Sequence, residues 1–579
     1  MLSWLRKLSR SPGTVDAERA AGVLRQAQDA GRSGDHRAAA RLLIAALDAH
    51  PGVAALHYEL GGAMRALGEP ARAVTCYRRA IELAPGMAEA HVDLALTLLA
   101  LGNAEAAERC ARDALALDAR SLAAHVNLGA ALEAQGRFED AATAFEATLG
   151  IDAGCVPALV NLGAVNLRLG RLDDAERVLA RAIELAPEAF EARLRMGHLL
   201  LERRQPERAA DCYREVLRLR PDLPAGHVSL GHSLDLQGRF DQALGCYERA
   251  LAIDPDDVQA HLNRAALWLL DEDYARGWDE YEWRLRDPAQ APLHQRFAQP
   301  RWDGGPLAGR RILVYGEQGL GDQIMAASCL PDLIAQAAHC IVDCDARLAP
   351  LFRRSFPQAT IHGGGPTDPV DWLRDTGPID VAVASASLPR RLRRSAAAFP
   401  DHAGYLRAAP ERVAAWRDRL ASLGAGRNIG LSWRGGVPQT NRGTRSLGLG
   451  DLAPLLRTPG ARYISLQYGP CAQDIDALRR DHGIEVIHWP AAIDDYDETA
   501  ALVSALDLTV SVCTSVVHLA GALGQPAWVL APLRPEPRYG KTGASMRWYP
   551  SVRVFRQSRY GDWSPVIASV ARALADAGP

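Results

Sequence analysis

The chain has 579 residues, of which 23% are charged and 48% hydrophobic, and its formal net charge is -3 at pH 7. This length predicts several domains, and the balanced charge excludes the basic surface of a typical nucleic-acid-binding protein. Polar residues interrupt every apolar stretch well before the ~18 residues that a transmembrane helix needs, which excludes a membrane-spanning protein.

Residues 1–18 are predicted to form a flexible basic leader. Leucines and basic residues are interspersed in it, at Leu2, Leu5, Arg6, Lys7, Leu8 and Arg10. Such a pattern also fits a short helix on a membrane surface. The leader lacks the apolar core and cleavage site of a secretory signal, so we expect a cytoplasmic protein.

An internal repeat follows, over residues 19–290. Alanines recur every 34 residues, at Ala73, Ala107, Ala141, Ala175, Ala209 and Ala243. Small residues recur where two helices of a unit would touch, at Gly61, Ala95, Gly129, Gly163, Gly197, Gly231 and Ala265. Turn glycines recur at Gly68, Gly102, Gly136, Gly170 and Gly238. A 34-residue period of this kind is typical of tetratricopeptide helix pairs, and about eight units predict a superhelix whose concave face binds another chain.

The ten cysteines do not indicate a metal site. Four of them occupy one repeat position, at Cys76, Cys110, Cys212 and Cys246. Equivalent positions in a solenoid lie far apart along its axis, so these cysteines are interpreted as small apolar packing residues. We therefore expect neither a zinc site nor a bound cofactor.

Asparagines also fall in one repeat column, at Asn127, Asn161 and Asn263. They resemble the asparagine ladder with which N-acetylglucosaminyl protein transferases hold acceptor backbone amides. Two interpretations stay open. The column either lines an acceptor groove, or consists of solvated polar residues on the inner face. Arg195 and Ser229 interrupt it.

The pattern changes after the repeats. Residues 291–310, rich in Pro and Gly, are a predicted connector. Residues 311–425 and 426–579 then read as two Rossmann-like halves. Buried strands are expected at 312–315, 340–344, 379–383, 429–433, 463–467, 485–489, 508–512 and 527–530. The predicted fold class is an all-α tetratricopeptide superhelix followed by an α/β domain of GT-B architecture.

Several motifs carry a family resemblance when they are taken together. They are GEQGLGDQI (316–324), GLSWRGG (430–436), TNRGTRSL (440–447), SLQYG (465–469) and SVCTSVVHLAGALGQPAWVL (511–530). The chain resembles GT-B glycosyltransferases related to bacterial heptosyltransferases, in the subgroup fused behind tetratricopeptide repeats. Some of these are similar to flagellin glycosyltransferases and to O-linked N-acetylglucosamine transferases.

The resemblance implies a catalytic base on the first glycine-rich turn. In this chain the family's Gly-Asp pair is Gly321-Asp322, which places Asp322 in the cleft at the carboxyl end of a strand. A carboxylate there takes the proton of an acceptor hydroxyl during inverting transfer. The alternative is that Asp322 only caps its helix. Glu317, on the same turn, is the second candidate base.

The resemblance also implies a phosphate site at the start of a helix. Thr514 and Ser515 open that helix, where free backbone N–H groups and the helix dipole favour an anion. His518 lies one turn further and is either a further donor to phosphate or an ordinary helix histidine. Arg434, Arg442 and Arg445 are candidates to neutralise phosphate, and Gln467 is a candidate to contact the nucleotide.

One residue departs from the family pattern. Cys513 stands where the family usually has an aspartate that positions the donor, which leaves the donor's identity open. The sequence also has no DxD-type metal motif, in agreement with metal-independent transfer.

Three functional interpretations follow. The first is a protein O-glycosyltransferase that moves a sugar from a nucleotide-sugar to Ser or Thr of a polypeptide, with flagellin as the preferred acceptor. The second is a scaffold whose α/β part is inactive. The third is transfer to lipopolysaccharide or another glycan, which has no need of a peptide groove. A homodimer is compatible with all three.

Overall fold

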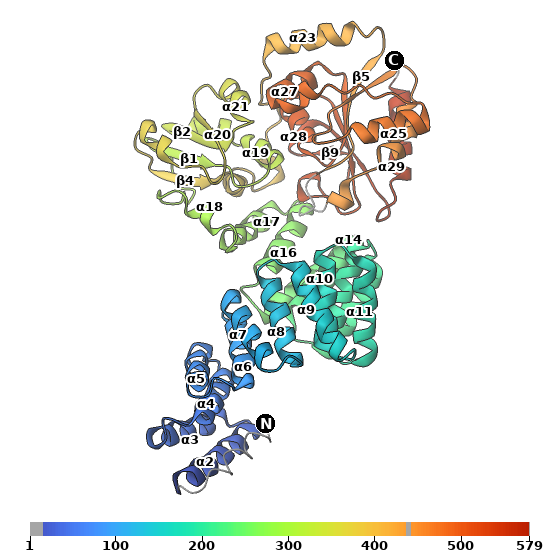
Figure 1. Cartoon of the computed structure of the whole chain (residues 1–579). Coiled ribbons are helices and arrows are strands. Elements are labelled where there is room, and N and C mark those ends of the chain that lie inside the picture. The colour runs from blue at the N-terminus through green and yellow to red at the C-terminus, as the bar shows by residue number, and fades with distance from the viewer. Residues whose placement is uncertain (1–14, 436–441, 578–579) are drawn as a thin grey trace. The chain divides into compact units, whose positions relative to one another are not determined.

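The computed structural model describes residues 15–435 and 442–577, and the side chains of 20–435 and 443–577. The chain forms two compact units, Met1–Pro221 and Asp222–Pro579. The first unit consists of helices, and the second joins four further helices to an α/β region (Figure 1). The expected order, an all-helical array followed by an α/β region, is confirmed.

Helices of the first unit pack as six antiparallel pairs. They are α2 (Val15–Arg32), α3 (His36–Ala49), α4 (Ala54–Ala66), α5 (Pro70–Leu83), α6 (Ala88–Ala100), α7 (Ala104–Leu117), α8 (Leu122–Ala134), α9 (Phe138–Ile151), α10 (Val156–Arg168), α11 (Leu172–Leu185), α12 (Phe190–Glu202) and α13 (Pro206–Leu219). Two more pairs open the second unit: α14 (Pro224–Leu236) with α15 (Phe240–Ile253), and α16 (Val258–Leu270) with α17 (Tyr274–Tyr281). Among the described residues this makes the eight repeat units that the 34-residue period predicts.

Size complementarity explains the small residues of each first helix. A Cβ added at Gly129 would lie 2.5 Å from the Phe145 ring, sixteen residues later. The same short approach, to the residue sixteen positions later, recurs at Gly61, Gly163, Gly197 and Gly231, opposite Tyr77, Leu179, Tyr213 and Tyr247. Where the first helix carries Ala95, the residue sixteen positions later is the small Ala111. The small residues therefore mark the contact between the paired helices, as the sequence predicts.

The turns between paired helices use left-handed backbone. The turn glycines Gly68, Gly102, Gly136, Gly170 and Gly238 have φ between 73° and 77°. Arg204 and Glu272, with φ of 58° and 61°, occupy the same repeat position in two other units. Since side chains rarely adopt this conformation, the turn geometry of the repeat overrides the local preference of these two residues.

The α/β region contains two sheets in the described residues. The first has the order β3-β2-β1-β4 and is parallel throughout, with strands β1 (Arg311–Tyr315), β2 (His339–Asp345), β3 (Thr360–Gly364) and β4 (Val381–Ala384). The second has the order β6-β5-β7-β8-β10-β9, with β5 (Arg427–Ser432), β6 (Ala461–Ser465), β7 (Leu508–Val512), β8 (Ala527–Ala531), β9 (Ser545–Met546) and β10 (Tyr549–Arg556). Its strands are parallel except at the β10–β9 pair.

Helices surround both sheets (Figure 1). Those of the first half are α19 (Leu320–Ala327), α20 (Leu330–Gln336), α21 (Ala349–Ser355) and α22 (Leu388–Leu392). Those of the second half are α23 (Pro410–Ala421), α24 (Ala453–Leu456), α25 (Ala472–His482), α26 (Pro490–Asp494), α27 (Tyr496–Ala505), α28 (Ser515–Ala522) and α29 (Ser564–Asp576). The central strands β1 and β7 are buried almost completely. Strand β1 carries apolar side chains to both faces, whereas one face of β7 carries the buried polar residues Thr509 and Ser511.

The predicted strand at 485–489 is wrong. Among these residues only Ile487 pairs, through an isolated bridge to Ile464. Three strands of the described residues were not expected, β3, β9 and β10. Most other predicted strands agree with the structure within about two residues; the one at 379–383 is shifted, since β4 covers Val381–Ala384.

The last repeat packs directly on the α/β region. The Trp278 indole donates to the carbonyl of Arg393 at 3.1 Å, and Asp279 pairs with Arg390 and Arg394 at 2.7 and 2.8 Å. The expected connector contains α18 (Ala291–Gln295) and a bridge from Arg301 to Ala382. Residues 222–310 therefore belong to the same compact unit as the sheets.

Candidate functional site

Asp322 lies at the carboxyl end of the first sheet's central strand. After β1, residues 316–319 turn and α19 begins, with Gly319 at its N-cap. Asp322 is therefore in the first turn and does not occupy the capping position, so its interpretation as the helix cap is wrong. Its side chain is 25% exposed, and its Oδ1 lies 2.6 Å from Nη2 of Arg538. The carboxylate is thus accessible and paired with one cation.

Glu317 lies on the same turn in different surroundings. Its side chain is only 3% exposed. It accepts from Arg284 at 2.9 Å and from the Ala386 backbone N–H at 3.1 Å, and it lies 3.5 Å from His294. Arg284 belongs to the 3-10 helix η1 (Glu282–Arg286), directly after the last repeat. Glu317 therefore connects the turn to the segment that follows the last repeat. Of the two candidate bases, Asp322 has the more accessible carboxylate.

The predicted helix start at 514–515 is confirmed. Helix α28 covers Ser515–Ala522, and the Thr514 hydroxyl caps it by accepting from the Val516 N–H at 3.2 Å. Ser511 lies 2.9 Å from the same hydroxyl. The helix therefore begins directly after β7, with its N-terminal backbone groups at the carboxyl edge of the second sheet.

The N-termini of α19 and α28 meet at Gly321. A Cβ at this glycine would lie 2.9 Å from Cδ2 of His518 and 3.4 Å from Cα of Ser515. Only a residue without a side chain fits at this distance, so Gly321 brings the two halves together. The contact places Asp322 beside the start of α28.

His518 is buried and hydrogen-bonded through both ring nitrogens. Its Nδ1 lies 3.0 Å from the Tyr549 hydroxyl, and its Nε2 lies 3.2 Å from Nη1 of Arg538. Burial, and then the Arg538 and Arg445 guanidiniums, hold the pKa of His518 well below its ordinary value. A neutral imidazole that accepts from Arg538 has no free N–H to offer a phosphate, so His518 supports Arg538.

Arg538 is the site residue that sequence reasoning missed. It lies in the 3-10 helix η8 (Pro537–Tyr539), which follows β8, and no motif points to it. Burial opposes its charge, but the carboxylates of Asp322 and Glu536 more than compensate and raise the pKa of Arg538 above its ordinary value. On the same segment, Glu536 pairs with Arg445. Arg445 is thus the predicted arginine that the structure pairs with the segment carrying Arg538.

The remaining predicted arginines differ. Arg434 donates to the Pro470 carbonyl and pairs with Asp474 at 3.2 Å, so its guanidinium is engaged beside β6 and α25. The side chain of Arg442 lies outside the described residues.

Gln467 is 4% exposed, and both the oxygen and the nitrogen of its side-chain amide already form hydrogen bonds within the protein. Oε1 accepts from the backbone N–H groups of Trp433 and Arg434 at 3.0 and 2.8 Å. Nε2 donates to the carbonyls of Arg434 and Tyr468 at 3.1 and 3.0 Å. The side chain holds the ends of β5 and β6 in place, and contact with a nucleotide would cost one of these bonds.

Cys513 is buried between β7 and α28. Burial, followed by the Glu536 carboxylate, raises the pKa of this thiol well above its ordinary value. A thiol that stays protonated is a poor nucleophile. Its position therefore argues for packing and against covalent catalysis.

The asparagines of the repeat column have unequal surroundings. Asn127 is 7% exposed and donates to the Val92 carbonyl of the preceding unit at 3.0 Å, so it ties neighbouring repeats together. Asn161, on α10, is half-buried. Asn263 belongs to the second compact unit and accepts from Gln259 at 2.8 Å.

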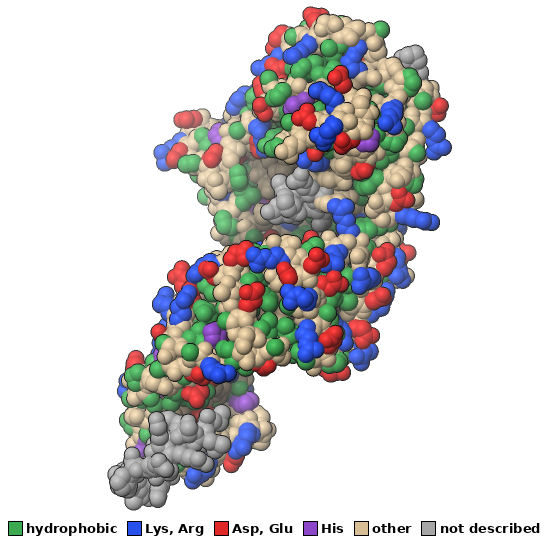
Figure 2. Space-filling view, turned by 45° about the vertical axis from the view of Figure 1, so that its right-hand side comes forward, with side chains coloured by type: hydrophobic (Ala, Val, Ile, Leu, Met, Phe, Trp, Pro, Cys, Tyr) green, Lys and Arg blue, Asp and Glu red, His purple; other side chains and the backbone are tan. Residues whose placement is uncertain are grey.

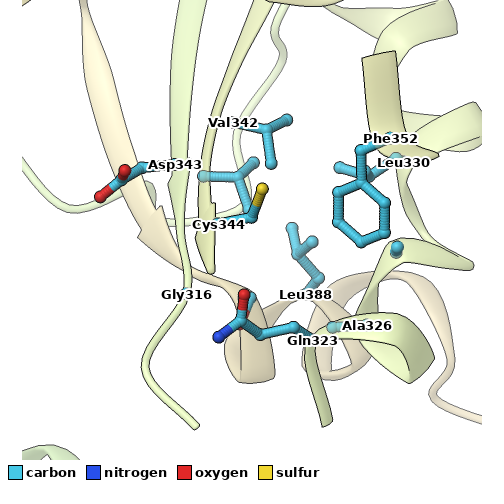
Figure 3. Close-up of a pocket in the computed structure, with 12 residues that line it drawn as sticks. Gly316, Gln323, Ala326, Leu330, Val342, Asp343, Cys344, Phe352 and Leu388 are labelled. Atoms are coloured by element: carbon cyan, nitrogen blue, oxygen red, sulfur yellow. The ribbon is translucent and has the colours of Figure 1, made fainter. Parts of the chain in front are cut away.

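A small cavity lies in the first α/β half, behind the turn that carries Asp322 (Figure 3). Apolar side chains from β1, β2, α19 and α20 line most of it, together with Gln323 and Asp343. Its volume of about 10 Å³ holds at most a single water. It is too small for a substrate.

Among residues 15–435 and 442–577, no cluster of three or more His, Cys, Asp or Glu side chains is arranged to hold a metal. Within the same residues, every helix is too short or too polar to cross a bilayer.

Comparisons with known proteins concern mainly the helical array. The model of the cilia and flagella-associated protein 70 C-terminal domain, a tetratricopeptide region, matches residues 3–228, and a tetratricopeptide repeat model matches residues 236–270. Protein FlbA of Caulobacter vibrioides is 34% identical over 329 residues, which are 54% of this chain and 54% of that protein. The match thus spans about half the length of this curated relative.

Solved structures also have partial similarity to this chain. The Cut9-Hcn1 hetero-tetramer of the APC/C is 14% identical, covers 46% of this chain and 53% of that chain, and has a TM-score of 0.38. A tetratricopeptide repeat protein of Parabacteroides merdae is 18% identical, covers 43% and 98%, and also has a TM-score of 0.38. By the two matching family models, the helical array of this chain consists of tetratricopeptide repeats, and the chain is similar to protein FlbA.

Proposed function

We propose that this chain is a protein O-glycosyltransferase of the GT-B type. One observation carries the proposal: Asp322 is an accessible carboxylate at the point where the N-termini of α19 and α28 meet. Inverting transfer requires a base for the acceptor and electropositive groups for the departing phosphate. Asp322 supplies the first, and the start of α28 with the nearby arginines supplies the second.

The fused repeats support a polypeptide acceptor. Tetratricopeptide arrays bind other chains, whereas a glycan acceptor gives no reason for eight such units. We propose that the array holds a polypeptide while its Ser or Thr hydroxyl enters the α/β site. Flagellin is the preferred acceptor because of the family resemblance, and a nucleotide-sugar is the co-substrate.

The test is nucleotide binding, measured by titration calorimetry on the full chain with CMP, UDP, GDP and ADP. We expect saturable binding of one nucleotide, and binding about tenfold weaker in His518→Ala because Arg538 loses its support. Arg412→Gln is the matched control, since this arginine pairs with Asp495 and Glu498 on the same half, away from Asp322. Binding of no nucleotide would favour the scaffold.

A further inference from the structure

Arg538 bridges the candidate base and the buried histidine. Its Nη2 lies 2.6 Å from Oδ1 of Asp322, and its Nη1 lies 3.2 Å from Nε2 of His518. The Arg538 side chain is 21% exposed. A single cation thus occupies the carboxylate that the proposed reaction needs free.

His518 orients this guanidinium. Its ring is fixed from behind by the Tyr549 hydroxyl at 3.0 Å, and the ring and Tyr549 are both almost fully buried. Because Nε2 accepts from Arg538, the imidazole is the neutral tautomer with its proton on Nδ1. The histidine therefore holds Arg538 in place without depending on Asp322.

Two arginines among the described residues of the site are each paired with a carboxylate. Arg538 pairs with Asp322, and Arg445 pairs with Glu536, two residues before Arg538 on the same segment. An incoming phosphate must therefore compete with a carboxylate for each guanidinium. Arg538 is the one whose second anchor, His518, is neutral and stays in place when the carboxylate is exchanged.

We propose that Arg538 binds the phosphate of the nucleotide-sugar and, in doing so, releases Asp322 to act as base. This inference rests on the proposed function. In the step that follows, the acceptor O–H gives its proton to Asp322 and its oxygen forms a bond to the anomeric carbon. The bond from that carbon to the phosphate oxygen breaks, and the electron pair leaves with the phosphate, which Arg538 neutralises.

The exchange has a consequence for the order of binding. Without the donor, Arg538 holds Oδ1 of Asp322 at 2.6 Å and so competes with an acceptor hydroxyl for that oxygen. We therefore expect the donor to bind before an acceptor is deprotonated.

The test compares nucleotide binding by four full-length chains: wild type, Arg538→Gln, Asp322→Asn and the double variant. The ligand is whichever of CMP, UDP, GDP and ADP the wild type binds. We expect Arg538→Gln to weaken binding about tenfold or more, since a charge-assisted contact to phosphate is lost. We expect Asp322→Asn to tighten binding about threefold, since the competing carboxylate is gone. In the Arg538→Gln background the Asp322→Asn change has no effect, because the two residues act through one contact.

Three outcomes overturn the inference while leaving the proposed function intact: wild-type binding that Arg538→Gln leaves unchanged, no tightening by Asp322→Asn, or equal tightening with and without Arg538. Binding of no nucleotide by the wild type would overturn the proposed function itself. Arg412→Gln again serves as the control for loss of a surface cation. If Arg538→Gln does not fold, Arg538→Lys takes its place in both single and double variants, because it keeps the charge and loses the forked contact.

Discussion

The first compact unit and the α/β region use charged side chains in opposite ways. In the repeats, charges of both signs are interspersed over the surface (Figure 2). Many of their pairs are exposed and lie within one helix, as for Arg177 and Asp174, whose side chains are 72% and 52% exposed. Others join neighbouring units, as for Arg171 and Glu139. In the second unit, pairs such as Arg284–Glu317 and Arg534–Asp235 join residues far apart in sequence and are largely buried. Exposed pairs keep a repeat hydrated, whereas buried pairs fix the segments that form the candidate site.

Deletion of the first compact unit tests whether the second unit folds and functions without it. A chain lacking residues 1–221 keeps the second compact unit whole, so we expect it to fold and to bind nucleotide like the full chain. It loses most of the acceptor-binding array, and modification of a polypeptide should fall on the order of 100-fold because the acceptor is no longer held near the site. Intact mass of the acceptor after incubation measures this.

Deletion of residues 1–288 is the matching variant. It removes Asp235 and Arg284, which leaves Arg534 and Glu317 buried without their partners. We expect this shorter chain to misfold, seen as loss of a cooperative urea transition. A stable, nucleotide-binding chain 289–579 would contradict the view that the last repeats belong to the α/β unit.

Single pairs sharpen the same comparison. Asp235 is 3% exposed at its side chain, and its removal leaves the Arg534 charge uncompensated. Asp235→Ala should lower the free energy of unfolding by about 3 kcal/mol. Asp174→Ala, in an exposed pair of the repeats, should change it by less than about 1 kcal/mol. Urea titration of both variants measures the change in the free energy of unfolding. Equal changes in the two variants would refute the contrast between buried and exposed pairs.

The packing of the repeats has its own test. Gly129→Ala places a Cβ against the Phe145 ring. Overpacking costs about 1–3 kcal/mol, and the better helix propensity of Ala returns about 1 kcal/mol. We expect a net loss of about 1 kcal/mol. Gly150→Ala, in open space on α9, should be neutral or stabilising.

A second substitution isolates the contact. In the Phe145→Ala background, the further change Gly129→Ala gives the same Ala–Ala pair that the protein has at Ala95 and Ala111. Gly129→Ala should then no longer destabilise. A cost that persists in this background would mean that some contact other than Phe145 opposes the methyl group.

Buried His518 gives the smallest effect, a dependence of stability on pH. Its pKa is held below the ordinary value in the folded state, so the unfolded chain binds the proton first. Stability from this group is therefore complete above about pH 6.5 and declines as the pH falls below it, by about 1 kcal/mol at most at pH 5.5. Arg538, Arg445, Tyr539 and Tyr549 surround the ring.

His518→Gln should reduce the difference in unfolding free energy between pH 7.5 and 5.5. Urea titrations at the two pH values measure it. A difference equal to that of the wild type would show that other groups account for the acid sensitivity.

The sequence predicts the repeats closely because each unit repeats the same local contacts. The position of Gly136 or Phe145 within its 34-residue unit predicts its structural role, because the period places the same neighbouring positions around it in every unit. Arg204 and Glu272 occupy the repeat position of the turn glycines and adopt the same left-handed backbone, which their own preference would not predict.

The candidate site is only partly predictable. Strand ends identify Asp322 and Thr514, because parallel strands place their carboxyl ends at one edge. They do not reveal what each side chain contacts. Glu317 and Gln467 also follow strands, yet buried partners engage both. Arg538 lies in an irregular segment without a motif, and only the three-dimensional approach of η8 to α19 reveals it.

The central claim is that Asp322 is the base of a sugar transfer to a polypeptide. The most direct measurement is the intact mass of flagellin co-produced in cells with the wild-type chain or with Asp322→Asn. The account predicts a mass gain of one or more sugars with the wild type and a loss of at least ~100-fold in modified flagellin with the variant. Equal modification by both chains would contradict it.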